Sequence, residues 1–187
     1  IVTSIACDKS CQQGEPVEFV VGDSQTMETF QISSINGETI ATVIIPSQTE
    51  ANIPEGSRLN IKPLSISEVP AAEIVSNSVL SITLTDSFGN DIPLPGKVEI
   101  CLEAQLEKED EGCLAFVSSS NEWECEDSCL KTNKEGKVCG KTTHFTNFAI
   151  LLGGGGDNQS SGCSGSTENT LLFPILSISF VAVAIII

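Results

Sequence analysis

Apolar and polar residues alternate in short runs along residues 16–152 of the chain. The segment 81–85 alternates strictly and 98–103 nearly repeats the pattern, so each is expected to bury one face and expose the other. Turn-forming pairs such as Asn36-Gly37 and Pro95-Gly96 separate the runs. Strands are therefore predicted over 16–21, 29–33, 39–45, 58–64, 78–85, 97–103, 113–117 and 147–152.

This succession of short strands and turns predicts an all-β fold, an antiparallel β-sandwich. One short turn of helix is expected over 68–74, and no internal repeat or sustained helical period is visible before residue 171. The alternating segments place these residues in the core: Leu80, Ile82, Leu84, Val98 and Ile100.

Composition divides the chain into four parts. The chain begins at Ile1 with no signal sequence, so we expect it to be the C-terminal part of a longer protein, with 1–14 ending an upstream region or linker. Residues 15–152 form the predicted sandwich. A Gly- and Ser-rich linker and spacer covers 153–170, and an apolar tail covers 171–187.

The tail contains no charged residue, and a polar spacer at 163–170 and small residues at 160–162 precede it. That order is typical of a glycosylphosphatidylinositol (GPI) signal, which the cell replaces with a lipid anchor. A single C-terminal transmembrane segment is the alternative, disfavoured because the tail is short for a span and contains Pro174. The expected attachment residue is Ser160, and the alternatives are Ser161, Asn158, Gly162 and Ser164. Asn158-Gln159-Ser160 is also a glycan acceptor motif.

The chain is strongly acidic, with 9 basic residues against 25 acidic ones. Nucleic acid and anionic membrane surfaces are therefore poor partners, because binding to them depends on Lys and Arg. The acidic run at 107–111 is interpreted as a solvated hairpin tip, since EF-hand spacing is missing. With one His and no phosphate-binding glycine loop, the sequence predicts neither conventional catalysis on an external substrate nor a cofactor.

Eight cysteines indicate an oxidising compartment and a disulfide-stapled domain. Their spacing fits no common zinc finger, so no metal site is predicted. Cys163 would be removed with the tail if the anchor is attached at Ser160. Spacing leaves the connectivity of Cys139 and the other cysteines open, and plausible pairs are Cys125–Cys129, Cys101–Cys113 and Cys7–Cys11.

The segment 113–152 carries the most specific pattern in the chain. It reads Cys113-Leu-Ala-Phe116, Trp123-Glu-Cys125, Cys129-Leu, Cys139, and then His144-Phe145-Thr146-Asn147-Phe148-Ala-Ile-Leu-Leu152. This order resembles the G-protein-coupled-receptor proteolysis site (GPS) motif at the end of a GAIN domain. It departs from the family in having Phe145 for the usual Leu and in lacking the second Cys of Cys-x-Cys. Segments 43–46 and 53–63 resemble, more weakly, the β-sandwich entry of ZU-type modules.

The resemblance implies self-cleavage between Phe145 and Thr146. His144 would take the proton of Thr146 Oγ, the hydroxyl would add to the Phe145 carbonyl, and water would hydrolyse the resulting ester. Any enzyme activity would be this single turnover. The alternative is that His144 is a polar residue at a hairpin end and Thr146 a strand residue without chemistry. Trp123 is expected to fill the core beside disulfides, and the residues of the last strand that should face the core are Phe148, Ile150 and Leu152.

The tail and the motif together predict the membrane-proximal extracellular domain of a GPI-anchored protein on the outer face of the plasma membrane. The expected partners are the membrane, through the lipid anchor, the upstream ectodomain of the same protein, and an unidentified extracellular ligand. A non-cleaving structural stalk that displays an upstream adhesion or receptor region is the alternative.

Overall fold

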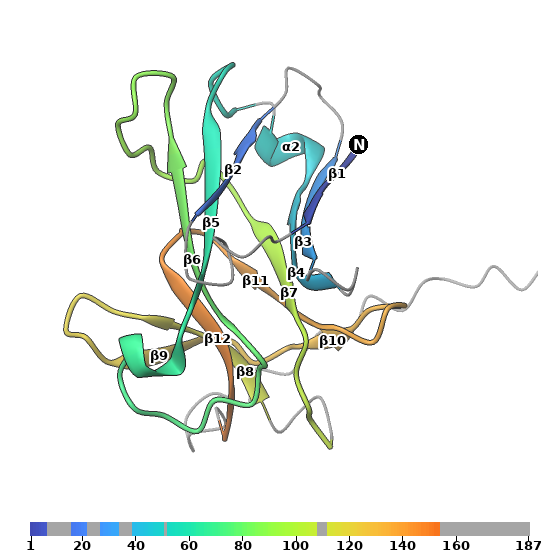
Figure 1. Ribbon diagram of the computed structural model, residues 1–187, viewed down its shortest axis with the longest axis vertical. Coiled ribbons are helices and arrows are strands. Elements are labelled where there is room, and N and C mark those ends of the chain that lie inside the picture. The colour runs from blue at the N-terminus through green and yellow to red at the C-terminus, as the bar shows by residue number, and fades with distance from the viewer. Residues whose placement is uncertain (7–15, 22–26, 34–38, 51, 108–111, 154–187) are drawn as a thin grey trace, which may run out of the picture.

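The computed structural model describes residues 1–6, 16–21, 27–33, 39–50, 52–107 and 112–153. These residues form two six-stranded sheets packed face to face (Figure 1). The all-β sandwich expected from the alternation is confirmed. Within these residues no helix has the length and apolar character needed to cross a bilayer.

The strand order is β1-β3-β4-β7-β11-β10 in the first sheet and β2-β5-β6-β12-β8-β9 in the second. Neighbouring strands are antiparallel, except that β1 and β3 are parallel. The first sheet contains β1 (Val2–Ala6), β3 (Glu28–Ser33), β4 (Thr39–Ile45), β7 (Val98–Leu102), β11 (Val138–Thr142) and β10 (Lys131–Thr132). The second contains β2 (Val17–Val20), β5 (Arg58–Leu64), β6 (Val79–Thr85), β12 (Asn147–Leu152), β8 (Gly112–Val117) and β9 (Trp123–Asp127).

The inward faces of both sheets form one hydrophobic core. Phe19 of β2 and Phe30 of β3 meet across it edge to face, with ring centroids 5.2 Å apart. On β11, Gly140 lets the sheets approach closely, because a Cβ there would lie 2.6 Å from Cβ of Leu114. The residues that alternation assigned to the core are all buried, and that prediction is confirmed: Leu80, Ile82, Leu84, Val98 and Ile100.

Four strands were not predicted: β1, β9, β10 and β11. Strand β9 carries three acidic residues and forms a sheet edge, so it has no alternating apolar face to detect. In β11 a glycine and a lysine interrupt the apolar run. Strand β10 spans only Lys131–Thr132 and β1 lies within 1–14, which was expected to be an upstream region or linker.

In the described part of the chain, two short helices connect strands of the sandwich: α2 (Ser47–Glu50) and the 3₁₀ helix η1 (Ile66–Glu68). The helical turn expected over 68–74 is wrong, because η1 ends at Glu68. A capping box fixes its start, in which the Glu68 carboxylate accepts from the Ser65 amide at 2.8 Å. Pro70 favours extended backbone at Val69, which ends the helix.

One disulfide joins directly opposed residues of β7 and β11, Cys101 and Cys139, whose Cα atoms lie 4.0 Å apart. The suggested pair Cys101–Cys113 is therefore wrong. The suggested pair Cys125–Cys129 is wrong too. Cys125 has a free thiol, whereas the sulfur of Cys129 is already part of a disulfide that does not include Cys125. Spacing misled here because it ignores the sheet register, which places residues far apart in sequence opposite each other. Cys7 and Cys11 lie outside the described residues.

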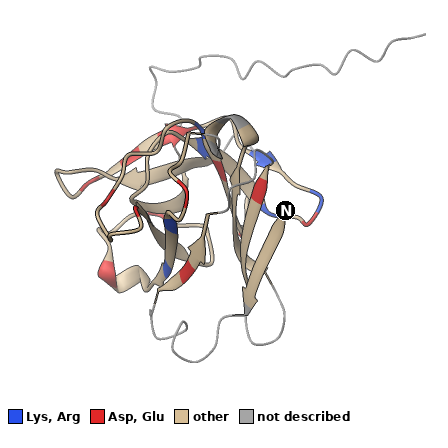
Figure 2. Cartoon of the chain, turned by 90° about the horizontal axis from the view of Figure 1, so that it is seen from above, with Lys and Arg blue, Asp and Glu red and all other residues tan. Residues whose placement is uncertain are grey.

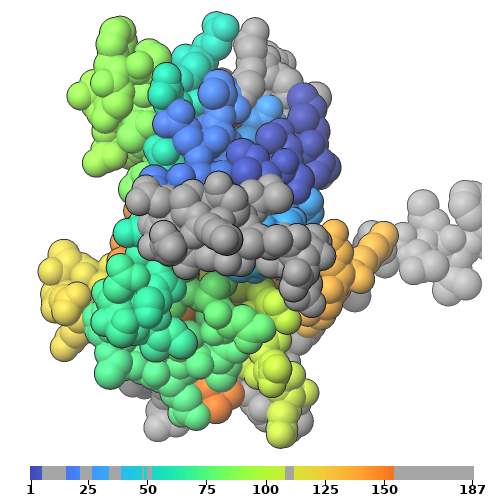
Figure 3. Space-filling view, viewed as in Figure 1, coloured from blue at the N-terminus to red at the C-terminus, as the bar shows by residue number. Residues whose placement is uncertain are grey.

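The acidic residues are spread over both sheets and their loops rather than gathered into one patch (Figure 2). The loop between β6 and β7 projects at the top of the molecule (Figures 1 and 3). In the turn that follows β6, the Asp86 carboxylate accepts hydrogen bonds from the Phe88 and Asn90 amides. This loop returns toward the core through Ile92 and Leu94, which pack against it.

Candidate functional site

The His144-Phe145-Thr146 segment forms the turn by which the chain crosses between the two sheets. It follows β11, an inner strand of the first sheet, and precedes β12, an inner strand of the second (Figure 1). The turn contains no residue with positive φ. Because the strands on either side are each paired with neighbours on both edges, the ends of this turn are fixed by the sandwich.

The imidazole of His144 lies between polar and aromatic neighbours. Its Nδ1 atom is 3.4 Å from Oε1 of Glu126 and 3.5 Å from Oγ1 of Thr142. The ring packs edge-on against Phe116, with centroids 4.5 Å apart, and tilted against Phe148 at 5.8 Å. The Nε2 atom is buried and has no hydrogen-bond partner. One ring nitrogen is thus held by partners, and the other is unpartnered.

Glu126 reaches His144 because it is the extra residue of a β-bulge on β9. Leu114 of β8 pairs with Asp127 while Ala115 pairs with Cys125, which leaves Glu126 without a paired residue on β8. The Glu126 side chain is only 17 % exposed, and its Oε1 atom also accepts a hydrogen bond from the Thr143 amide at 3.1 Å.

Asp127, the next residue, holds the strand that enters the turn. Its Oδ2 atom accepts from the Lys141 amide at 2.7 Å, and its Oδ1 atom accepts from the Cys129 amide at 2.9 Å. Glu126 and Asp127 therefore bind alternate amides of the segment 141–143. We call these two residues the β9 clamp, because they tie the edge of the second sheet to the end of β11.

Thr142 fixes the backbone of His144 from within the turn. The hydroxyl is buried, donates to the His144 carbonyl at 2.9 Å and accepts from the His144 amide at 3.2 Å. A local bond pattern of this kind closes a turn without help from the strand ladder. Thr142 stands two residues before His144, in the approach where the family's second Cys is missing.

The Thr146 hydroxyl is directed elsewhere. Its Oγ1 atom donates to the Val117 carbonyl at 3.4 Å, while the Thr146 carbonyl accepts from the Ile82 amide at 2.9 Å. Among the hydrogen bonds of the described residues, none joins Thr146 to His144. The expected base and nucleophile are therefore in the same turn, two residues apart, but the bond between them is not formed in this arrangement.

Phe145 packs against the core at the side of a groove that runs over the turn. Residues 91–94 of the loop between β6 and β7 also line this groove. The groove is lined by Thr83, Leu84, Asp91, Ile92, Pro93, Leu94, Thr143, His144 and Phe145.

Of the residues expected to fill the core, some are buried and others are not. Phe148 and Ile150 are fully buried, whereas Leu152 is 37 % exposed at the end of β12, so the expectation for Leu152 is wrong. Trp123 is also not a core residue. It lies outside the core cluster, partly buried on β9, and its Nε1 atom donates to the Pro70 carbonyl at 2.8 Å. Trp123 instead fastens the segment after η1 to the edge of the second sheet.

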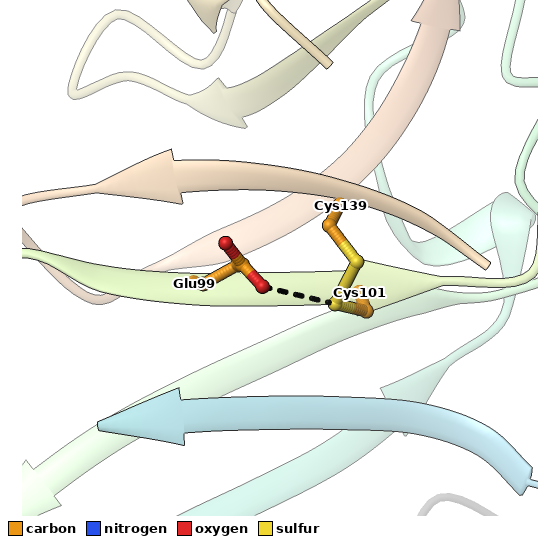
Figure 4. Close-up of side chains that lie close together, drawn as sticks. All are labelled: Glu99, Cys101 and Cys139. Carbon is orange, nitrogen blue, oxygen red and sulfur yellow. Dashed lines mark hydrogen bonds between the residues drawn. A yellow bond between two sulfur atoms is a disulfide. The ribbon is translucent and has the colours of Figure 1, made fainter. Parts of the chain in front are cut away.

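One group of three side chains in the described part of the chain has the spacing of a metal site, namely Glu99, Cys101 and Cys139 (Figure 4). Both sulfur atoms belong to the disulfide, so neither is a thiolate that could bind a metal ion. The Glu99 carboxylate merely approaches the Cys101 sulfur, at 3.8 Å. The anchor candidates Ser160, Ser161 and Asn158 lie outside the described residues.

Sequence reasoning missed Glu126, Asp127 and Thr142. Glu126 and Asp127 stand in an acidic stretch after Trp123, and nothing in that stretch shows which carboxylate turns toward His144. The bulge decides this, and a bulge leaves no periodic signal.

The comparison with known families agrees with this arrangement. The family model GPS, described as GAIN subdomain B, matches residues 5–154, from the end of β1 through β12. No curated protein matches the chain.

Proposed function

The chain belongs to the GPS family of GAIN subdomain B, and from this membership we propose that it is a membrane-proximal extracellular domain that cuts its own backbone between Phe145 and Thr146. The observation that supports cleavage most directly is the fixed environment of His144. The β9 clamp and the Thr142 hydroxyl hold this residue beside the bond, while its Nε2 atom has no partner.

The reaction begins when the Thr146 hydroxyl leaves the Val117 carbonyl and turns toward the Phe145 carbonyl carbon. The hydrogen bond lost is neutral and long, and such a bond contributes about 1 kcal/mol. His144 takes the hydroxyl proton through its unpartnered nitrogen as the Oγ–C bond forms. The C–N bond then breaks, and the proton passes to the departing Thr146 amine.

Glu126 supports this step in the way a carboxylate supports a catalytic histidine. It accepts from Nδ1, fixes the orientation of the ring and stabilises the imidazolium that forms during proton transfer. Water hydrolyses the resulting ester, which leaves a carboxylate on Phe145 and a free hydroxyl on Thr146.

The cut chain would remain one assembly because β12 lies inside the second sheet. It pairs with β6 on one side and with β8, over Phe148–Leu152, on the other. Phe148 and Ile150 are fully buried. The C-terminal piece would carry the GPI anchor, supported by the order of small residues, polar spacer and apolar tail. The larger piece would then stay on the membrane through strand pairing and packing alone.

A non-cleaving stalk is the second candidate function, and one observation favours it. The Thr146 hydroxyl is bonded to Val117 rather than to His144. In that case the motif only closes the sandwich, and the domain serves to display an upstream region above the membrane.

The deciding experiment expresses the full chain through a secretory pathway and compares wild type with Thr146→Ala on a reducing, denaturing gel. Cleavage gives two fragments from wild type, a new N-terminus at Thr146, and an intact chain from the variant. Thr3→Ala on the exposed part of β1 is the matched control and should be cut like wild type. An intact wild-type chain would rule out self-cleavage and leave the non-cleaving stalk as the proposed function. Release of the anchored piece by a phosphatidylinositol-specific phospholipase tests the anchor separately.

A further inference from the structure

One edge of β12 is shared between a regular strand and an irregular segment. Strand β6 pairs with Asn147 and Phe148, at the start of β12. Beyond Phe148 the same edge is held by residues 70–77, which lie between η1 and β6 and which we call the strap. The strap crosses the bottom of the molecule, where β12 ends (Figure 1). The C-terminal half of β12 therefore lies between β8 and the strap.

The strap is hydrogen-bonded to both the carbonyl and the amide of Ile150. The Ile150 carbonyl accepts from the Val75 amide at 2.9 Å and from the Ser76 amide at 3.3 Å. The Ile150 amide donates to Oγ of Ser76 at 3.1 Å. Two residues on, the Leu152 amide donates to the Glu73 carbonyl at 3.0 Å. Because Ser76 is buried, loss of its hydroxyl would leave the Ile150 amide without a partner away from water.

The two ends of the strap are fastened to parts of the chain that precede Phe145. At one end, the Asn77 amide donates to the Glu103 carbonyl, just after β7, at 2.9 Å. At the other end, the Pro70 carbonyl accepts from Nε1 of Trp123 on β9 at 2.8 Å. The strap thus connects β12 to the part of the chain on the N-terminal side of the Phe145 bond.

The strap is held less firmly than the ladder on the other side of β12. Residues 71–73 are exposed, and Ile74 is half-buried and lies outside the core cluster. On the other side, β8 pairs with residues 148–152 in the interior of the sheet. Segments with few buried apolar contacts open at a lower free energy than inner strands. The strap is therefore expected to open before β12 separates from β8.

We propose that the strap is a latch that controls how long the C-terminal piece stays bound after the chain is cut between Phe145 and Thr146. This inference rests on the proposed self-cleavage. While the strap is closed, the end of β12 is hydrogen-bonded along both edges. When the strap opens, Ile150 and Leu152 lose their partners on one edge, and β8 alone holds that end. Release then requires no opening of the first sheet.

The release test follows the cut full chain, extracted in mild detergent and captured through a tag placed before Ile1. Loss of the C-terminal piece into the wash is measured against time. Ser76→Ala leaves the Ile150 amide without its partner and should speed release roughly tenfold or more. Trp123→Phe keeps an aromatic ring but removes the bond to Pro70, without changing a residue of the strap or of β12. It should speed release roughly fivefold.

Ser78→Ala is the matched control for Ser76→Ala. It is the same substitution two residues further on, and the Ser78 hydroxyl is buried without a hydrogen-bond partner, so release should match wild type. Wild-type release rates in both Ser76→Ala and Trp123→Phe would overturn the proposal. Faster release in only one of them would also overturn it, because the strap would then not act as a unit. Equally fast release in Ser78→Ala would do the same.

Hydrogen exchange tests the strap separately from cleavage, in the full chain with Thr146→Ala, where every molecule is intact. Adding Trp123→Phe should make the Ile150 and Leu152 amides exchange roughly fivefold faster, because the strap opens more often. The amides of β3 and β4 in the first sheet should exchange at an unchanged rate. An uncut wild-type chain would contradict the proposed function, whereas unchanged exchange at Ile150 and Leu152 would overturn the role of the strap.

Discussion

Glu126 and His144 belong to segments that approach from opposite sheets, and Oε1 of the carboxylate lies 3.4 Å from Nδ1 of the imidazole. The same oxygen accepts the Thr143 amide at 3.1 Å. One side chain thereby fixes both the ring and the backbone beside it. The contact exists because a bulge on β9 removes Glu126 from the strand ladder and frees it to point at the turn.

Replacing Glu126 with Gln should slow cleavage while leaving the fold intact. The amide oxygen of Gln can still accept from Thr143, but the negative charge facing His144 is lost. A hydrogen bond to a charged group contributes about 1.5–3 kcal/mol, which corresponds to a roughly ten- to hundredfold slower reaction. The measurement is the fraction of cut chain against time after synthesis, alongside the urea midpoint of uncut protein.

Glu124→Gln provides the control for this change. Glu124 is an exposed residue of the same strand with no part in the clamp, so the substitution removes an equal charge without touching His144. Equal cleavage rates in Glu126→Gln, Glu124→Gln and wild type would show that Glu126 has no role in orienting the histidine.

Thr142→Val should destabilise the domain, because valine keeps the shape of threonine and removes its hydroxyl. The His144 carbonyl and amide would both lose their partner in a partly buried turn. We expect a loss of about 1–3 kcal/mol in the free energy of unfolding, measured by urea denaturation in the Thr146→Ala background. Thr142→Ser retains the hydroxyl and should recover most of that loss.

The same substitution at Thr42 gives the opposite expectation. This residue is buried on β4, and its Oγ1 atom has no hydrogen-bond partner. Thr42→Val removes an unsatisfied polar atom, so stability should stay unchanged or rise. If the two Thr→Val variants lose stability equally, the loss at Thr142 comes from packing and not from its hydrogen bonds.

Removing the disulfide between Cys101 and Cys139 should lower the free energy of unfolding by up to about 4 kcal/mol, the loop-entropy value for a sequence separation of 38. The double variant Cys101→Ala, Cys139→Ala avoids leaving a lone thiol in the buried pair. Urea denaturation at equal protein concentration measures the loss. An unchanged midpoint would show that the disulfide does not stabilise the domain by the loop-entropy amount.

The sequence predicted the strands that carry one apolar and one polar face, as in the run from Ser81 to Thr85. In such strands the burial of one face against the core produces the alternation of apolar and polar residues, so the alternation predicts the strand. The alternation pattern did not predict β9, because this edge strand faces water and carries acidic residues. The disulfide partners also could not be read from spacing, since the sheet register opposes Cys101 to Cys139 across 38 positions.

In the candidate site, too, the sequence revealed some residues and not others. His144, Phe145 and Thr146 were found because their chemistry requires them to be adjacent in sequence. Glu126 and Thr142 were missed because their roles depend on a bulge and on the path of a turn. Such features arise from tertiary pairing, and no local propensity specifies which carboxylate faces the imidazole.

Retention of the C-terminal piece after cleavage should depend on the buried part of β12. Phe148 is fully buried, packs beside the ring of His144 and pairs with Phe116 on β8. Phe148→Ala should lower the free energy of unfolding of the uncut protein by about 3–5 kcal/mol. After cutting, when no covalent link remains, the same loss should release the anchored piece from the larger fragment.

Leu152→Ala tests whether the loss of a buried side chain is the reason that Phe148→Ala releases the C-terminal piece. Leu152 lies at the end of the same strand and is 37 % exposed, so its truncation should cost far less and leave the two pieces together. Size-exclusion chromatography of the cut, detergent-free ectodomain separates the two results, because retained pieces elute together and released ones do not. Co-elution of the pieces in both variants would mean that backbone pairing with β6 and β8 holds β12 without its buried side chains.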